Sequence, residues 1–103
     1  GLAEKNNVLI DQAIEAQQKV LYLYENGEFP DYYNLDTFVA LAKRSLAETL
    51  MEAYEFNNAL YTQYYGDIGT LLRNAAKALE SCGTDFDKDY NANLIVRYEG
   101  LPA

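Results

Sequence analysis

A run of acidic and amide side chains near the C-terminal end of the chain has the spacing of a calcium-binding loop. The run consists of Asp85, Asp87, Asp89, Asn91 and Asn93. An EF-hand loop supplies calcium with oxygen ligands from alternate positions, as this run does, but it also needs Gly at its sixth position and a bidentate Glu at its twelfth. Those positions hold Tyr90 and Val96. The alternative interpretation, which we favour, is that the Asp residues cap the first turn of a helix.

A second acidic group lies at helical spacing in the middle of the chain and comprises Glu48, Glu52 and Glu55. Carboxylates at this spacing hold two metal ions in some helical bundles, which usually also contribute histidines through a Glu-x-x-His motif. The sequence contains no His. The apolar stripe of the same predicted helix also points away from the three acids, so we expect a solvent-exposed acidic face.

The residue types that most enzymes use for nucleophilic or acid–base chemistry are scarce. Without His, the Ser-His and Cys-His nucleophile systems and the commonest metal ligand are excluded. Cys82 is the only cysteine, which excludes an internal disulfide and a Cys-x-x-Cys motif. We therefore expect no enzymatic activity and no cofactor, with calcium at the Asp85–Asn93 run as the one metal hypothesis.

Tyrosine is the most abundant aromatic residue, with ten copies. Tyr is enriched at protein interfaces because its ring buries a large area while its hydroxyl stays hydrogen-bonded. Four tyrosines fall on the polar side of a predicted helix, in a loop or at a helix end, and these are Tyr22, Tyr32, Tyr33 and Tyr65. We predict that they are exposed and bind a partner, with Glu48, Glu52 and Glu55 as a separate acidic contact face.

The net charge of −8 restricts the class of partner. Proteins that bind nucleic acid present a basic patch to the phosphates, so we expect no direct nucleic-acid binding. A membrane-spanning helix needs about 20 consecutive apolar residues, and no stretch approaches that length. We therefore expect a soluble protein, either cytoplasmic or secreted. Gly1 without a preceding Met suggests a tag remnant and the removal of an upstream signal peptide or domain.

The first predicted helix, at about 3–25, has two apolar stripes side by side. One stripe contains Leu9, Ala13, Ala16, Val20 and Leu23. The other contains Ile10, Ile14, Gln17, Leu21 and Tyr24. Together the stripes cover about half of the helix circumference, which is wider than the face that a single neighbouring helix buries. We therefore expect this helix to pack against two neighbours.

The remaining periodicity predicts two more long helices and a C-terminal arm. A helix over about 36–65, with a possible break at 56–58, would end at Gly66, and another would cover about 68–82. The arm after Thr84 is either a short fourth helix or an extended strap, because Leu94, Ile95 and Val96 also suit a strand. The prediction is one all-α domain over 1–103, an antiparallel bundle of three long helices with this arm.

The sequence thus predicts a small acidic helical module that acts through protein–protein contacts, either by self-association or by docking a partner. The alternative is a module that binds calcium or a small ligand through the Asp85–Asn93 run. An enzyme is the third class, and no catalytic residue can be named for it. The exposure of the four tyrosines and the path of the acidic run distinguish the first two classes.

Overall fold

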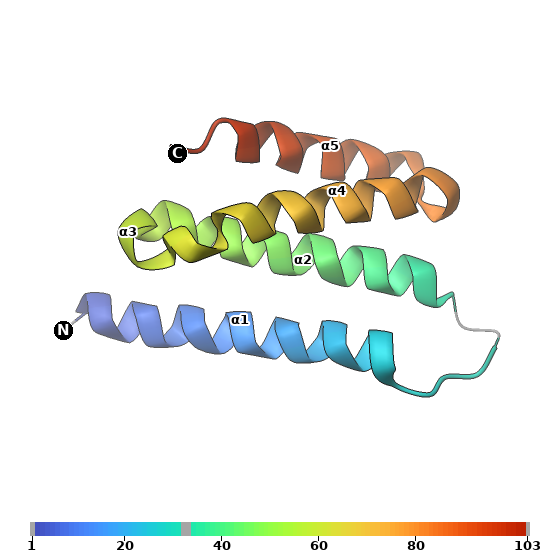
Figure 1. The fold of residues 1–103 in the computed structure, drawn as a ribbon, viewed down its shortest axis with the longest axis horizontal. Helices are drawn as coiled ribbons and strands as arrows, with labels where there is room; N and C mark the ends of the chain where they lie inside the picture. The colour runs from blue at the N-terminus through green and yellow to red at the C-terminus, as the bar shows by residue number, and fades with distance from the viewer. Residues whose placement is uncertain (1, 32–33, 103) are drawn as a thin grey trace.

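The computed structural model describes residues 2–31 and 34–102 and confirms an all-α fold. Four long helices lie side by side in Figure 1, with α2 and α4 in the middle and α1 and α5 at the outside. They are α1 (Leu2–Asn26), α2 (Leu35–Phe56), α4 (Tyr65–Cys82) and α5 (Asp85–Glu99). A short helix, α3 (Asn58–Tyr61), and a single 3-10 turn, η1 (Thr62–Tyr64), connect α2 to α4.

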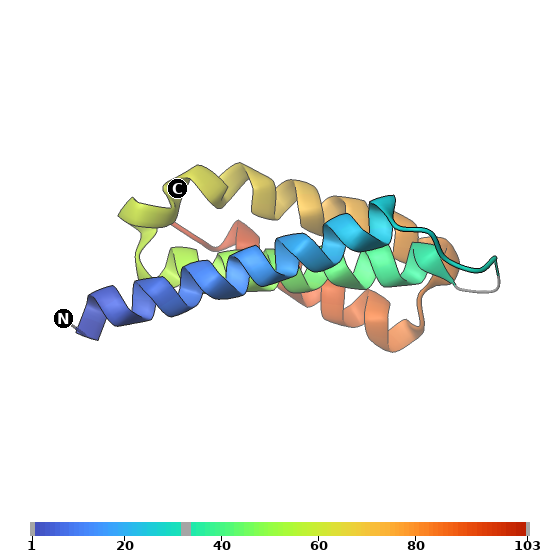
Figure 2. The ribbon, with the colours of Figure 1, turned by 90° about the horizontal axis from the view of Figure 1, so that it is seen from below.

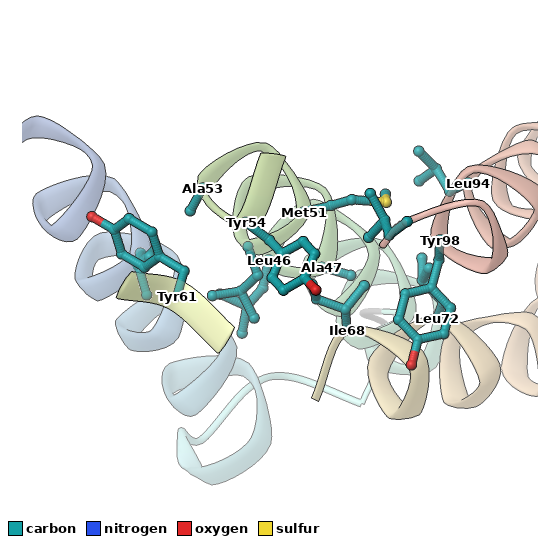
Figure 3. Packing of buried hydrophobic residues seen from close by; sticks show 13 residues of the cluster. Leu46, Ala47, Met51, Ala53, Tyr54, Tyr61, Ile68, Leu72, Leu94 and Tyr98 are labelled. Atoms are coloured by element: carbon teal, nitrogen blue, oxygen red, sulfur yellow. The ribbon is translucent and has the colours of Figure 1, made fainter. Parts of the chain in front are cut away.

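The hydrophobic core lies between α2 and α4, which are antiparallel and form the largest contact of the molecule. The α2 stripe repeats at three- and four-residue intervals and buries Leu46, Leu50 and Tyr54, while α4 buries Ile68 and Leu72. In Figure 3 the Tyr54 ring of α2 lies beside the Ile68 side chain of α4. Alanines such as Ala47 and Ala53 are interspersed along α2. Their small side chains allow neighbouring helices to approach closely.

The second helix ends earlier than the predicted Gly66. It breaks at Asn57, within the segment where a break was considered possible, because this residue has an extended backbone with φ of −153°. The Asn57 side chain caps α3 by accepting a hydrogen bond of 3.1 Å from the amide of Leu60. The chain therefore reverses over 57–64, and Gly66 belongs to the first turn of α4 instead of ending α2.

Of the two predicted forms of the C-terminal arm, a helix and an extended strap, the structure has the helix, α5. Thr84 forms a capping box, in which its hydroxyl accepts a hydrogen bond from the Asp87 amide while the Asp87 carboxylate accepts one from the Thr84 amide. Such a box satisfies two amides that a helix start otherwise leaves unpaired. Leu94 and Tyr98 then bury their side chains against the rest of the bundle. The packing of α5 is chiefly against α4.

The N-terminal helix α1 packs chiefly against α2. Ile14 is buried in the core, and Ile10 and Leu21 are partly buried against it. These residues belong to only one of the two predicted stripes. A second contact of α1 is with α3, where the hydroxyl of Tyr61 donates a hydrogen bond of 2.9 Å to the Asp11 carboxylate. In the described chain these neighbours leave the other predicted stripe exposed.

Candidate functional site

The Asp85–Asn93 run lies on α5 and does not form a loop. Residues two apart on an α-helix point in nearly opposite directions, so the five side chains spread around the helix. Asn91 is buried, with 1 % of its surface exposed, and its Nδ2 donates a hydrogen bond of 3.0 Å to the Leu72 carbonyl. Asp85, Asp89 and Asn93 are exposed. The structure thus does not bring the predicted calcium ligands to one point.

Asp87 has structural contacts that account for its position. Besides capping α5, it forms an ion pair of 3.3 Å with Arg44 on α2. The hydrogen bond with Thr84, together with the charge of Arg44, holds the pKa of Asp87 below its usual value. Over residues 2–31 and 34–102, no group of three or more acidic, Cys or His side chains is close enough to hold a metal ion.

The predicted acidic face of α2 is only partly free in solvent. Glu48 is half-buried and accepts a hydrogen bond of 2.7 Å from the hydroxyl of Tyr90 on α5. Glu55 of α2 forms an ion pair with Arg97 of α5, with 2.9 Å between the Arg97 Nε and a carboxylate oxygen. Glu52 is exposed. The expectation of a fully solvent-exposed face is therefore corrected, since two of the three acids hold α5 against α2.

Tyr65 is also placed differently from its prediction. It is half-buried, and its ring centroid lies 5.5 Å from that of Tyr54 and 5.0 Å from that of Tyr98. The reason is that Tyr65 begins α4, where it faces the bundle, instead of closing a longer α2. Tyr22 is exposed on α1, as expected. Tyr32 and Tyr33 lie outside the described residues.

An exposed apolar stripe runs along α1, and no other helix covers it in the described chain. We call it the outer seam, and it consists of Leu9, Ala13, Ala16, Val20 and Leu23. All five are exposed, and the three larger ones strongly so: Leu9 by 63 %, Val20 by 45 % and Leu23 by 59 %. In Figure 2, α1 lies in front of α2, with no other helix over its near side.

The two flanks of the outer seam differ in character. The flank away from the bundle carries Lys5, Gln12 and Lys19, all exposed. Lys19 forms an exposed ion pair of 3.3 Å with Glu15, one turn earlier. This flank thus carries two lysines, one of which is paired with an acid of the same helix.

The flank toward the bundle meets α2 at an apolar hollow of about 310 Å³. Gln17, Val20 and Tyr24 line it from α1, and Phe38, Leu41, Ala42 and Ser45 line it from α2. The side-chain oxygen Oε1 of Gln17 is buried without a hydrogen-bond partner among the described residues. A buried acceptor without a donor is costly, by about 1–3 kcal/mol.

The contact residues predicted from the sequence are tyrosines and acids, and they do not include the outer seam. The signal was present in the width of the apolar arc on α1, which exceeds what one neighbouring helix covers. The chain matches no protein-family model, no curated protein and no solved structure. Within the described residues, no helix has the length and apolar character that crossing a membrane requires.

Proposed function

We propose that this chain is a protein-interaction module that docks an apolar helix along the outer seam of α1. The observation that carries the proposal is a continuous apolar stripe, Leu9 to Leu23, exposed along a well-formed helix. Single exposed apolar side chains are common on protein surfaces, whereas contiguous ones mark interaction sites.

The shape of the stripe favours a helix as the docked element. Its residues are separated by alternating steps of four and three, which is the heptad spacing of helices that pack lengthwise on each other. Leu9 and Leu23 are 14 residues apart, which corresponds to about 21 Å along the helix axis. Only an elongated apolar ligand covers that length, and an amphipathic helix provides one.

The exposed apolar side chains of the seam contribute favourably to binding. Full burial of a Leu or Val side chain contributes about 1.5–3 kcal/mol, and Leu9, Val20 and Leu23 keep about half of their surface for a partner. The alanines between them add little area but allow the docked helix to approach closely.

The test is photo-crosslinking with a benzophenone amino acid incorporated at Leu23, in cells that produce the protein. We expect a discrete covalent adduct to a polypeptide, and we expect the additional substitution Ala16→Glu to abolish it. The same amino acid at Gln18, exposed on another side of α1, is the control and should give no adduct. Equal labelling at Leu23 and Gln18, or labelling that survives Ala16→Glu, would contradict docking on the seam.

A further inference from the structure

We infer that the helix docked on the outer seam is the same seam of a second copy of this chain, with the two α1 helices parallel about a two-fold axis. The inference rests on the proposed function and names its partner. It follows from the pattern of the seam, from the two flanks and from the area that the contact buries.

The seam has the heptad pattern of a two-stranded parallel pair. Ala13 and Val20 occupy a positions and Leu9, Ala16 and Leu23 occupy d positions, while the half-buried Asn6 falls on the preceding a position. In a parallel pair each of these residues meets its own counterpart. Leu at d favours two-stranded pairing, and one Asn at an a position fixes the register because an amide is best satisfied by the matching amide.

The flanks complement each other in the parallel arrangement. A residue at a g position faces the e position of the next heptad on the other helix, which pairs Gln12 with Gln17 and Lys19 with Tyr24. The first pair places two amide side chains beside each other across the interface. The second pair places an ammonium group beside an aromatic ring, an attractive arrangement.

Charge complementarity extends to the neighbouring helix. In a parallel pair the Lys5 flank of one copy lies toward the bundle flank of the other, where α2 runs beside α1. Because α1 and α2 are antiparallel, the N-terminal half of α1 lies beside the C-terminal half of α2 (Figure 1), which carries the exposed Glu52. Lys5 of one copy thus approaches an acidic stretch of the other, and the arrangement is repeated across the two-fold axis.

The buried area sets the expected strength. A standard interface buries about 800 Å² on each partner with about 20–30 residues, or about 30–40 Å² per residue. The outer seam and its flanks offer about a dozen residues, so the contact buries about 400 Å² per copy. This is half of a standard interface and belongs to the weak class, so we expect a reversible dimer with a dissociation constant of about 10 µM or weaker.

The first experiment is sedimentation equilibrium from about 10 µM to about 1 mM protein, a range chosen around the strength expected from the area. The average mass should rise from the monomer value of 11.7 kDa toward twice that value. Ala16→Glu, which places a charge in the centre of the seam, should hold the mass at the monomer value. Gln18→Glu adds the same charge on another side of α1 and should leave the rise unchanged.

The second experiment tests the parallel orientation by disulfide trapping in a Cys82→Ser background. Leu23→Cys should form a covalent dimer under oxygen with a copper catalyst, because counterpart d positions adjoin in a parallel pair. Tyr22→Cys, equally exposed but outside the seam, should not. A mass rise with no Leu23→Cys disulfide would overturn the parallel arrangement.

The two proposals fail in different ways. A monomer at about 1 mM, with a Leu23 photo-adduct to a different polypeptide, would overturn self-association and leave the interaction module in place. A monomer that also gives no adduct at Leu23 would overturn both. Circular dichroism of Ala16→Glu should match the wild-type chain, since Ala16 is exposed and its substitution changes no core contact.

Discussion

The hydroxyl of Tyr90 on α5 donates a hydrogen bond of 2.7 Å to the carboxylate of Glu48 on α2, 42 residues earlier in the chain. The guanidinium of Arg44, one turn before Glu48, lies 4.4 Å from the centre of the same Tyr90 ring. One aromatic side chain thus contacts both an acid and a base of α2. Because α5 packs chiefly on α4, these contacts tie the C-terminal helix to a second element of the bundle.

Removal of the Tyr90 hydroxyl should loosen this connection. We expect Tyr90→Phe to lower the free energy of unfolding by about 1 kcal/mol, because a hydrogen bond to a charged acceptor is lost while the ring remains. Urea denaturation measures the change. Tyr22→Phe, on an exposed tyrosine of α1, is the control and should have no effect. A double-mutant cycle with Glu48→Ala, which removes the acceptor, should show coupling, and additive effects would contradict the contact.

Two glycines of α4 should respond in opposite ways to a methyl group. A Cβ at Gly69 would lie 2.7–2.9 Å from the Tyr98 side-chain end, whereas a Cβ at Gly66 meets nothing within 4 Å. Gly69→Ala should therefore lower stability by about 1–3 kcal/mol through overpacking against the buried Tyr98. Gly66→Ala should be neutral or slightly stabilising, since Ala is the better helix former. Thermal unfolding of the two variants in parallel gives the comparison.

The stability of the fold should fall in alkaline solution through Tyr61. Burial, and then the hydrogen bond from its hydroxyl to Asp11, raise the pKa of Tyr61 to about 12 from 10.0. The folded chain therefore holds the phenol proton more tightly than the unfolded chain does. The resulting stabilisation is complete below pH 10 and is lost as the pH rises from 10 toward 12. Tyr61→Phe should flatten this part of a pH series of urea denaturation curves.

The Thr84 capping box should stabilise the start of α5. We expect Thr84→Ala to lower the free energy of unfolding by about 1 kcal/mol, because the Asp87 amide loses its acceptor. Thr84→Ser keeps a hydroxyl in the same place and should retain most of the stability. Equal losses in the two variants, measured by urea denaturation, would show that the methyl group of Thr84 and not its hydroxyl is responsible.

The helices could be predicted from the sequence because their apolar residues recur with helical spacing and their ends carry caps. The Asp residues after Thr84 predicted a helix start at α5, whereas Leu94, Ile95 and Val96 also suit a strand. Tertiary packing favours the helix, because it buries Leu94 and Tyr98 against the bundle. The end of α2 was less predictable, because Asn57 disrupts the helix through its own backbone and cap, without Gly or Pro.

The candidate surface was harder to predict than the fold. The abundance of tyrosine predicted a contact surface made of tyrosines. The position of the Tyr65 ring, however, depends on the preceding turn, which the sequence predicted at Gly66 and the structure has at 57–64. The acids of α2 were expected in solvent because the sequence does not show where α5 lies. Periodicity located two apolar stripes on α1, but it could not show that the chain itself covers only one of them.

The position of α1 at the edge of the bundle makes it easier to unfold than the other long helices. The local stability of a helix depends on how much apolar surface it buries, and parts that bury less unfold separately and more often. Within the described chain α1 packs chiefly on α2, whereas α2 has α1, α4 and α5 around it. The backbone amides of α1 should therefore exchange with deuterated solvent before those of α2 and α4. The protein would then consist of a stable three-helix unit and one helix that unfolds separately from it.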